Sequence, residues 1–279
     1  MDAGAKRRLL EADAAGATSC QRFPLEPIAC FVGKDKTSSD TGEAIRFWRH
    51  RRLAREALVD GKVLTGRQFD AVAWDVVYAG LHSVPQMFQL WACKQVWDIA
   101  GTNALQSKWD TTTNKWCPSC QRAKETSAHV LMCSERGRVE TLQRTIDFVE
   151  DWLVQVETAP KIIQCVIQYA RGRGYISMGD ICGTMGQQFR DMAEEQDTIG
   201  WRRFMEGMLS KQLVCLQADA RALSGVGLMA VSWARQLVVR LLEVTHGQWI
   251  YRNIQVHDQQ QVLFKPWKRN NYNGKLRRK

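Results

Sequence analysis

The sequence predicts a mainly α-helical, multi-helix domain built around a small Cys-Cys-His-Cys (CCHC) zinc module, with disordered termini. Apolar residues recur at steps of three and four through most of the region between Phe69 and Thr245, which is the period of an amphipathic helix. The alternation of apolar and polar residues that marks half-buried strands is absent almost everywhere, so at most a small hairpin is expected at the metal. Between Cys117 and Cys133 the chain reads C-x2-C-x8-H-x3-C.

Three thiols and one imidazole in this pattern are the ligand set of a tetrahedral zinc ion. The predicted ligands are Cys117, Cys120, His129 and Cys133. Pro118 stiffens the turn between the first two thiols. His129 and Cys133 stand four residues apart and share one face if residues 127–133 are helical. Four protein ligands leave no position for water, so the metal is predicted to be structural.

Two neighbouring features fit that helix. Thr126 or Ser127 would cap its first turn, and Glu125 suits the positive end of the helix dipole. The alternative interpretation is a chance cluster of buried cysteines and a core histidine. The gap before His129 is longer than in the retroviral zinc knuckle, so the RNA-binding role of the knuckle does not follow from the spacing.

The bulk composition bounds the class of protein. The chain has 279 residues and a formal net charge of +10, of which residues 265–279 carry seven cations and no acid. The longest uncharged apolar stretch lies between Arg221 and Arg235 and is too short for a membrane span. Glu11 and Asp13 interrupt what would be a secretory signal, and unpaired thiols at zinc spacing favour a reducing, intracellular compartment.

Composition shifts suggest five segments along the chain. They are a disordered N-terminal segment (1–42) with one short helix over residues 6–15, a helical segment (43–115), the zinc module (116–140), a helical domain (141–258) and a basic tail (259–279).

The period of the apolar residues predicts individual helices. Before the metal we expect one helix over residues 69–81 and another that starts at Pro85 and ends at Gly101, followed by a polar stretch in which Trp109 and Trp116 are packing anchors. After the metal we expect helices over residues 142–156, 160–170, 185–196, 201–216 and 229–246, the last closed by Gly247. The remaining thiols of this region are expected to be core residues: Cys93, Cys165, Cys182 and Cys215.

Two basic clusters are candidates for contact with nucleic acid. The first is interleaved with Trp48 and consists of Arg46, Arg49, Arg51, Arg52 and Arg55; the second, in the tail, consists of Lys265, Lys268, Arg269, Lys275, Arg277, Arg278 and Lys279. Cations that neutralise phosphates, together with an aromatic that stacks on bases, bind nucleic acid without sequence preference. The alternatives are a solvated helix for the first cluster and a solubilising tail or nuclear import signal for the second.

Motifs of common enzymes are absent, and we expect no catalytic activity. There is no P-loop, no dinucleotide-binding glycine pattern and no Gly-x-Ser-x-Gly elbow. Glu243 and His246 at i, i+3 could share a metal, but His246 before Gly247 is more typical of a helix C-terminal cap. His257 with Asp258 is more typical of a solvated loop, and residues 171–174 read as a helix end rather than a nucleic-acid contact.

The residues of the cluster also resemble a known family. Residues 117–133 are similar to the C-P-x-C…E-T-x-x-H…C cluster downstream of the reverse transcriptase in many non-LTR retrotransposon proteins. The wider stretch 69–258 resembles transposon-like proteins of unicellular algae, through residues 87–96, 99–103, 199–207 and 245–252. The polymerase motif Tyr-x-Asp-Asp or Phe-x-Asp-Asp is missing, as is the endonuclease pattern that follows the cluster in some elements.

The resemblance implies a mobile-element protein that handles nucleic acid, and only the four metal ligands carry over to this chain. The function expected is that of a non-enzymatic, zinc-stabilised protein that binds RNA or DNA with low specificity. Two other interpretations stay open: a helical scaffold that binds a protein partner, favoured by an exposed apolar groove, and a degenerate nuclease or polymerase fragment, which needs acidic residues converging in a pocket.

Overall fold

The computed structural model describes residues 30–32, 35–37 and 41–275, with the side chains of Phe31 and of residues 45–257. The chain divides into two compact units, residues 1–57 and 58–279, each described by itself below. The helix expected over residues 6–15 and most of the segment expected to be disordered lie outside the described residues, as do all the side chains of the basic tail from Lys265 to Lys279.

The first unit contains a short hairpin and most of one helix. Strand β1 (Cys30–Val32) pairs antiparallel with β2 (Asp35–Thr37), with Phe31 opposite Lys36. Helix α2 (Thr41–Asp60) follows and ends three residues into the second unit. The hairpin lies within the segment 1–42.

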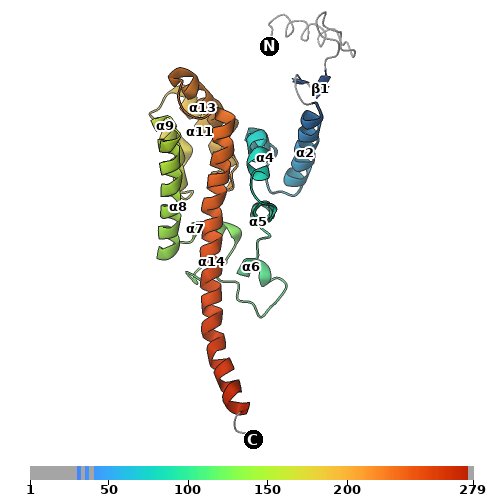
Figure 1. Cartoon of the computed structure of the whole chain (residues 1–279), viewed down its shortest axis with the longest axis vertical. Coiled ribbons are helices and arrows are strands. Elements are labelled where there is room, and N and C mark those ends of the chain that lie inside the picture. The colour runs from blue at the N-terminus through green and yellow to red at the C-terminus, as the bar shows by residue number, and fades with distance from the viewer. Residues whose placement is uncertain (1–29, 33–34, 38–40, 276–279) are drawn as a thin grey trace, which may run out of the picture. The chain divides into compact units, whose positions relative to one another are not determined.

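The second unit is helical apart from isolated bridges, and the prediction of a mainly α fold is confirmed. Its helices are α3 (Gly66–Ala71), α4 (Trp74–His82), α5 (Gln86–Val96), α6 (Asn103–Gln106), α7 (Ser127–Met132), α8 (Arg136–Gln155), α9 (Pro160–Arg171), α10 (Met178–Cys182), α11 (Gln187–Ile199), α12 (Trp201–Met205), α13 (Lys211–Ser224) and α14 (Ala230–Lys275). Figure 1 labels most of them.

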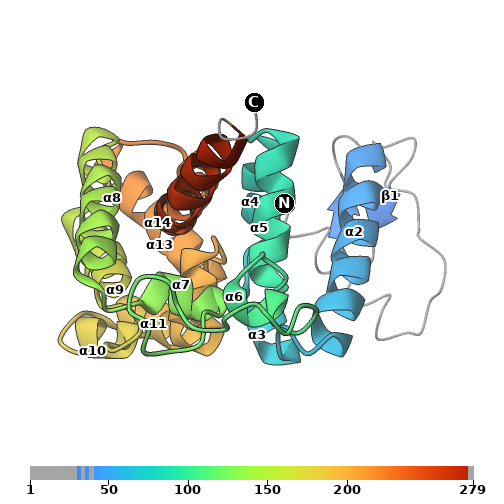
Figure 2. The same ribbon diagram turned by 90° about the horizontal axis from the view of Figure 1, so that it is seen from below.

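Helix α14 is the central element of this unit. Seen nearly end-on, it lies between α8 and the pair α4 and α5 (Figure 2), and it contacts both α8 and α4. Its buried residues follow the helical period: Trp233, Ala234, Leu237, Val238, Leu241 and Leu242. The predicted end at Gly247 is wrong, because α14 continues past it with Gln248 buried and bonded to the Arg138 carbonyl on α8. Packing against α8 outweighs the low helix propensity of one glycine.

The helices α8 and α9 agree closely with the apolar pattern. Leu142, Ile146, Val149 and Leu153 are buried on one face of α8, and Pro160 occupies the first position of α9. Proline suits that position because its missing N–H has no intrahelical acceptor there.

Two helices predicted as continuous are broken, and the breaks face each other. The chain leaves helical conformation at Val72, between α3 and α4, and at Gly207 (φ 84°), between α12 and α13. Val72 pairs with Ser210 in an antiparallel bridge, and the Ala73 amide donates to the Leu209 carbonyl over 2.9 Å. These bonds join positions more than 130 residues apart, and a local apolar period does not reveal them.

Four thiols outside the metal cluster were predicted to be core residues, and the prediction is right for two of them and wrong for the other two. Cys165 and Cys182 are buried, as expected, and their sulfurs lie 3.4 Å apart. Cys93 and Cys215 are exposed instead of buried. Cys93 stands on α5 and Cys215 on α13, and each lies on a side of its helix that is exposed to solvent.

The contact between α4 and α14 requires glycine at position 80. A Cβ added there would lie 2.8 Å from Val238 Cγ1 and 3.2 Å from the Arg235 carbonyl oxygen. Gly80→Ala is therefore expected to lower the free energy of unfolding by about 1–3 kcal/mol, measured by urea denaturation. Gly186→Ala is the control, because nothing lies within 4 Å of the added methyl group. Equal unfolding midpoints for the two variants would show that α4 and α14 do not pack as described.

Candidate metal centre

The first two candidate ligands lie on a tight hairpin-like loop. Trp116 and Lys124 form an isolated antiparallel bridge, and the Cys117 amide donates to the Ala123 carbonyl over 2.8 Å. Between them the Gln121 amide bonds the Cys117 carbonyl over 2.9 Å, which closes the turn. Gln121 takes a positive φ of 53°, so the chain reverses within a few residues and turns both thiols inward.

The other two candidate ligands come from helix α7, as predicted. The Thr126 hydroxyl accepts from the His129 amide over 3.1 Å and caps the first turn. Cys133 is the residue that ends the helix. The spacing of four residues places His129 and Cys133 on the same face, toward the loop.

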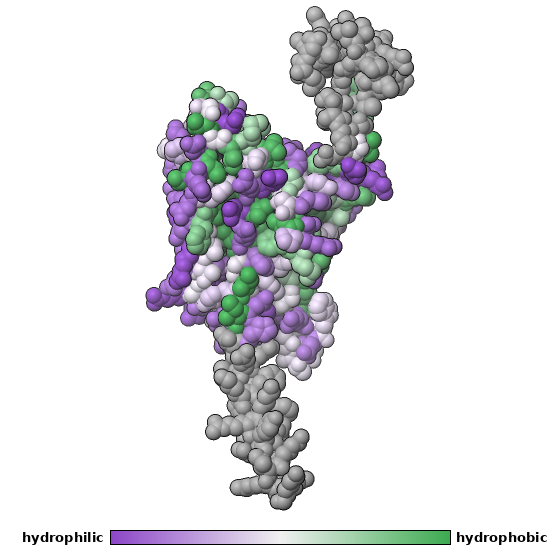
Figure 3. Space-filling model, in the orientation of Figure 1, coloured by the Kyte–Doolittle hydropathy of each residue, from purple (hydrophilic) through white to green (hydrophobic). Residues whose placement is uncertain are grey.

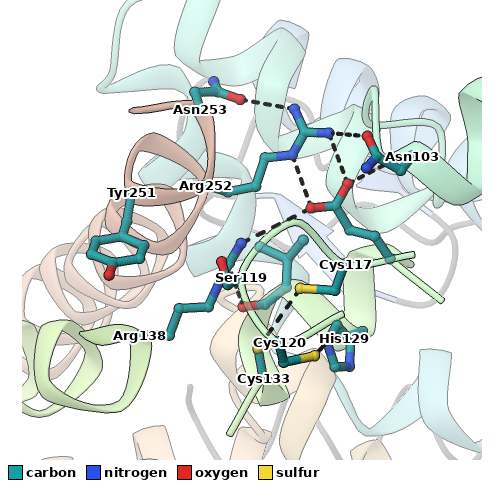
Figure 4. Close-up of polar contacts among 12 residues, drawn as sticks. Asn103, Cys117, Ser119, Cys120, His129, Cys133, Arg138, Tyr251, Arg252 and Asn253 are labelled. Carbon is teal, nitrogen blue, oxygen red and sulfur yellow. Dashed lines mark hydrogen bonds and ion pairs between the residues drawn. The ribbon is translucent and has the colours of Figure 1, made fainter. Parts of the chain in front are cut away.

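The four ligand atoms converge on one point (Figure 4). They lie within 4.8 Å of one another, with Cys117 Sγ 3.8 Å from Cys133 Sγ and Cys120 Sγ 3.4 Å from His129 Nε2. A tetrahedral zinc ion with Zn–S bonds of about 2.3 Å holds two sulfurs about 3.8 Å apart. The site therefore has the size and donor set to hold a metal ion, and it is the only such group of His, Cys, Asp and Glu in the described part of the chain.

Proximity also changes the acidity of the thiols. The hydrogen bond from the Cys133 thiol lowers the pKa of Cys117 to about 2, and the same bond raises the pKa of Cys133. Bonds to Cys117 and then Cys120 raise the pKa of His129 against the effect of burial. These shifts favour a thiolate at Cys117, whereas Cys133 and His129 would have to give up their protons for a metal ion to bind.

A buried ion cluster fastens the module to the helical core (Figure 4). The Glu125 carboxylate is fully buried and accepts from Arg252 on α14 through Nε (3.0 Å) and Nη2 (2.7 Å). It also accepts from the Asn103 amide over 2.7 Å, and Arg138 Nη2 of α8 lies 4.0 Å away. Glu125 was expected to complement the dipole of α7, whose cap it directly precedes; the structure adds that it links the module to α14 and α8.

Arg138 also forms hydrogen bonds with the metal module that do not involve Glu125. Its guanidinium donates to Ser119 Oγ (2.8 Å) and to the Val130 carbonyl (3.2 Å), while its Nη2 has no hydrogen-bond partner. Arg173 donates to the carbonyls of Met132 and Cys133 over 2.6 and 2.8 Å. Arg173 therefore satisfies two carbonyl groups at the end of α7. This placement agrees with the prediction that residues 171–174 are a helix end rather than a nucleic-acid contact.

Glu243 and His246, noted in the sequence as a possible metal pair, do not form a second centre among the described residues. The side chain of Asp258, the partner noted for His257, lies outside the described residues. His246 lies within α14 and packs edge-on against Phe88 and Trp91, and burial lowers its pKa. The proposed role of His246 as a C-terminal cap is wrong because the helix does not end there. Glu243 pairs with Arg240 over 3.1 Å.

The structure places the first basic cluster on α2. All five arginines of this helix are exposed: Arg46, Arg49, Arg51, Arg52 and Arg55. Trp48 is half exposed, with the Arg52 guanidinium 5.6 Å from its ring centre, and Arg52 also pairs with Glu56 over 3.5 Å.

No helix among the described residues is long and apolar enough to cross a bilayer.

Comparison with known proteins gives no relative for this chain. No family model, no curated protein and no solved structure matches it.

Proposed function

We propose that this chain is a zinc-stabilised protein that binds RNA or DNA with low sequence specificity. We further propose that it derives from a retrotransposon, from the region associated with the reverse transcriptase but without the polymerase itself. We propose that it acts inside the cell, and in the nucleus if the basic tail serves as an import signal. We propose zinc as the metal because of the ligand types: three thiolates and one imidazole in a closed site select zinc over harder cations.

The observation that carries the binding proposal is the surface of α2. Residues 46–55 hold five exposed arginines and no acid, beside a half-exposed tryptophan. Arginines of this kind neutralise phosphates and release counterions, and an exposed indole stacks on bases of any type. Both interactions ignore sequence, which is why low specificity is expected.

Salt dependence tests this proposal. Full-length protein is expected to bind labelled oligonucleotides with an affinity that falls as salt rises, and each phosphate contact contributes roughly 0.7–0.9 to the slope. Replacing all five α2 arginines by Gln is expected to reduce the slope by roughly 2, if about half of them reach a phosphate. Removal of residues 265–279 is expected to reduce it further.

The control removes exposed arginines elsewhere. Arg136 and Arg144 on α8 pair with Glu140, and the double variant Arg136→Gln/Arg144→Gln is expected to leave the slope unchanged. Absence of salt-dependent binding by the wild-type protein would refute the proposal. If the α8 control lost as much of the salt slope for each arginine removed as the α2 variant does, only the net charge of the protein would matter.

A protein-binding scaffold is the second candidate function, and one surface favours it. An apolar groove lies between α9, α11 and α13, lined by Ile162, Phe189, Leu216 and Leu223. Leu223, Val226, Met229 and Val231 beside it are all at least half exposed. Figure 3 shows apolar side chains at the end of the unit where α13 lies. If the protein binds no oligonucleotide and self-associates less when Leu223 is replaced by Asp, this function takes precedence.

A further inference from the structure

A groove lined by lysines lies next to the metal centre. It has a volume of about 540 Å³ and is bordered by Lys108, Lys115 and Lys124, with Thr126 and Ser127 at the start of α7. Lys115 and Lys124 flank the loop that carries Cys117 and Cys120, so the fold of the metal loop sets the positions of two of the three ammonium groups.

The charge of this groove is not balanced by nearby acids. The three lysines are exposed, and within the described residues none of them pairs with a carboxylate. Asp98, on the rim, is occupied by Arg202 through two bonds of 2.7 and 3.0 Å. Asp110 accepts from Thr112 and Thr113, and these bonds lower its pKa, so its carboxylate stays charged. It does not line the groove, whose lining holds three lysines and Arg202 against a single acid, Asp98. The groove therefore presents a positive surface to solvent.

Two tryptophans follow directly after two of these lysines. Trp109 is 77% exposed and Trp116 is 40% exposed. Both were expected to be packing anchors, and the structure leaves both exposed to solvent instead. The Lys115 ammonium lies 5.5 Å from the Trp116 ring centre. Neither indole lines the groove itself, but each is next in sequence to a lysine that does. Large indoles left in water beside a positive surface are typical of surfaces that stack on a ligand.

We infer that this groove binds single-stranded nucleic acid, with phosphates on the lysines and bases stacked on Trp109 and Trp116. This inference rests on the proposed function and names a second contact surface for it, on the zinc module. Single strands are favoured over duplexes because their base faces are free to stack. An acidic peptide would satisfy the lysines but would leave the two indoles without a flat partner.

The test uses full-length protein and short single-stranded RNA and DNA oligonucleotides over a range of salt concentrations. Lys108→Gln/Lys115→Gln/Lys124→Gln is expected to lower the salt slope by roughly 2, at about 0.7 for each contact. Trp109→Ala is expected to weaken binding roughly 5- to 150-fold, the loss typical of one stacked base. A duplex of the same composition is expected to lose less from Trp109→Ala.

Two matched controls separate the groove from general surface effects. Lys161→Gln removes an exposed lysine of α9, and Phe148→Ala removes an aromatic of α8 that is 72% exposed; neither is expected to change binding. Circular dichroism and zinc content of each variant are expected to match the wild type, because every replaced side chain is exposed.

The outcomes distinguish the two proposals. If the wild type binds oligonucleotides and the groove variants bind equally well, the groove inference is overturned and the α2 arginines remain the contact surface. If the wild type binds no oligonucleotide at low salt, both proposals fall. A poly-glutamate peptide serves as an additional probe. If the groove variants lose the binding of this peptide but keep the binding of oligonucleotides, the partner is an acidic protein and the inference is wrong.

Discussion

Cys117→Ser is expected to abolish metal binding and to unfold the loop between Trp116 and Cys133. The Cys117 thiol is fully buried at the centre of the four ligand atoms, and its loss leaves three ligands and an opening for water. Structural zinc contributes on the order of 10 kcal/mol to the folding of small peptides at neutral pH, so the loss is expected to be among the largest of any single substitution. The measurements are zinc content and thermal unfolding followed by circular dichroism.

The control is Cys215→Ser, which changes an exposed thiol outside the cluster and is expected to leave both readouts unchanged. A chelator should lower the unfolding temperature of the wild type and of Cys215→Ser, but not that of Cys117→Ser, which is already metal-free. Identical unfolding temperatures for wild type and Cys117→Ser would contradict a structural role for the cluster.

Glu125→Ala is expected to destabilise the protein by about 3–5 kcal/mol, because it leaves buried arginines without a counter-charge. Arg252 is 5% exposed and Arg138 is 1% exposed, so neither guanidinium reaches water when the carboxylate is removed. The measurement is the free energy of unfolding in urea. Glu140→Ala, which breaks an exposed pair with Arg136, is the control and is expected to have little effect.

A double-mutant cycle identifies the partner. Glu125→Ala/Arg252→Ala is expected to cost less than the sum of the two single substitutions, because removing both charges leaves fewer buried groups unpaired. Additive effects, or a cost for Glu125→Ala no larger than for Glu140→Ala, would show that the module is not held to α14 through this ion pair.

The sequence predicts the metal cluster well because its determinants are local. All four ligands, the helix that carries His129 and ends at Cys133, and the Thr126 cap lie within 17 residues of chain. Spacing and capping preferences act over one or two helical turns, and both can be recognised without knowledge of the rest of the fold.

The partners of the module are less accessible to such reasoning. Glu125 meets Arg252 across 127 positions, and Arg173 meets Cys133 across 40. Arg252 lies on α14, and nothing in the residues next to it in the sequence indicates an ion pair. An arginine inside an apolar helical stretch was the one available signal, since charges there are rarely buried without a partner.

The breaks in the helices and the exposed aromatics depend on tertiary structure for the same reason. Residues 69–81 have a continuous apolar period, yet the bridge from Val72 to Ser210 interrupts the helix. Trp109 and Trp116 were predicted to be packing anchors, whereas both side chains are exposed to solvent. Periodicity indicates which face of an element is apolar, but not whether another element covers it.

The central claim is a closed zinc site that anchors a helical protein, and X-ray absorption at the zinc edge tests it most directly. In protein purified under reducing conditions, we expect one zinc per chain with three sulfur neighbours at about 2.3 Å and one nitrogen at about 2.0 Å. Cys133→Ser, which removes another of the four ligands, should lose the zinc as Cys117→Ser does, and Cys93→Ser should change nothing. Purified protein that contains no zinc, or zinc surrounded by oxygen and nitrogen alone, would contradict the account.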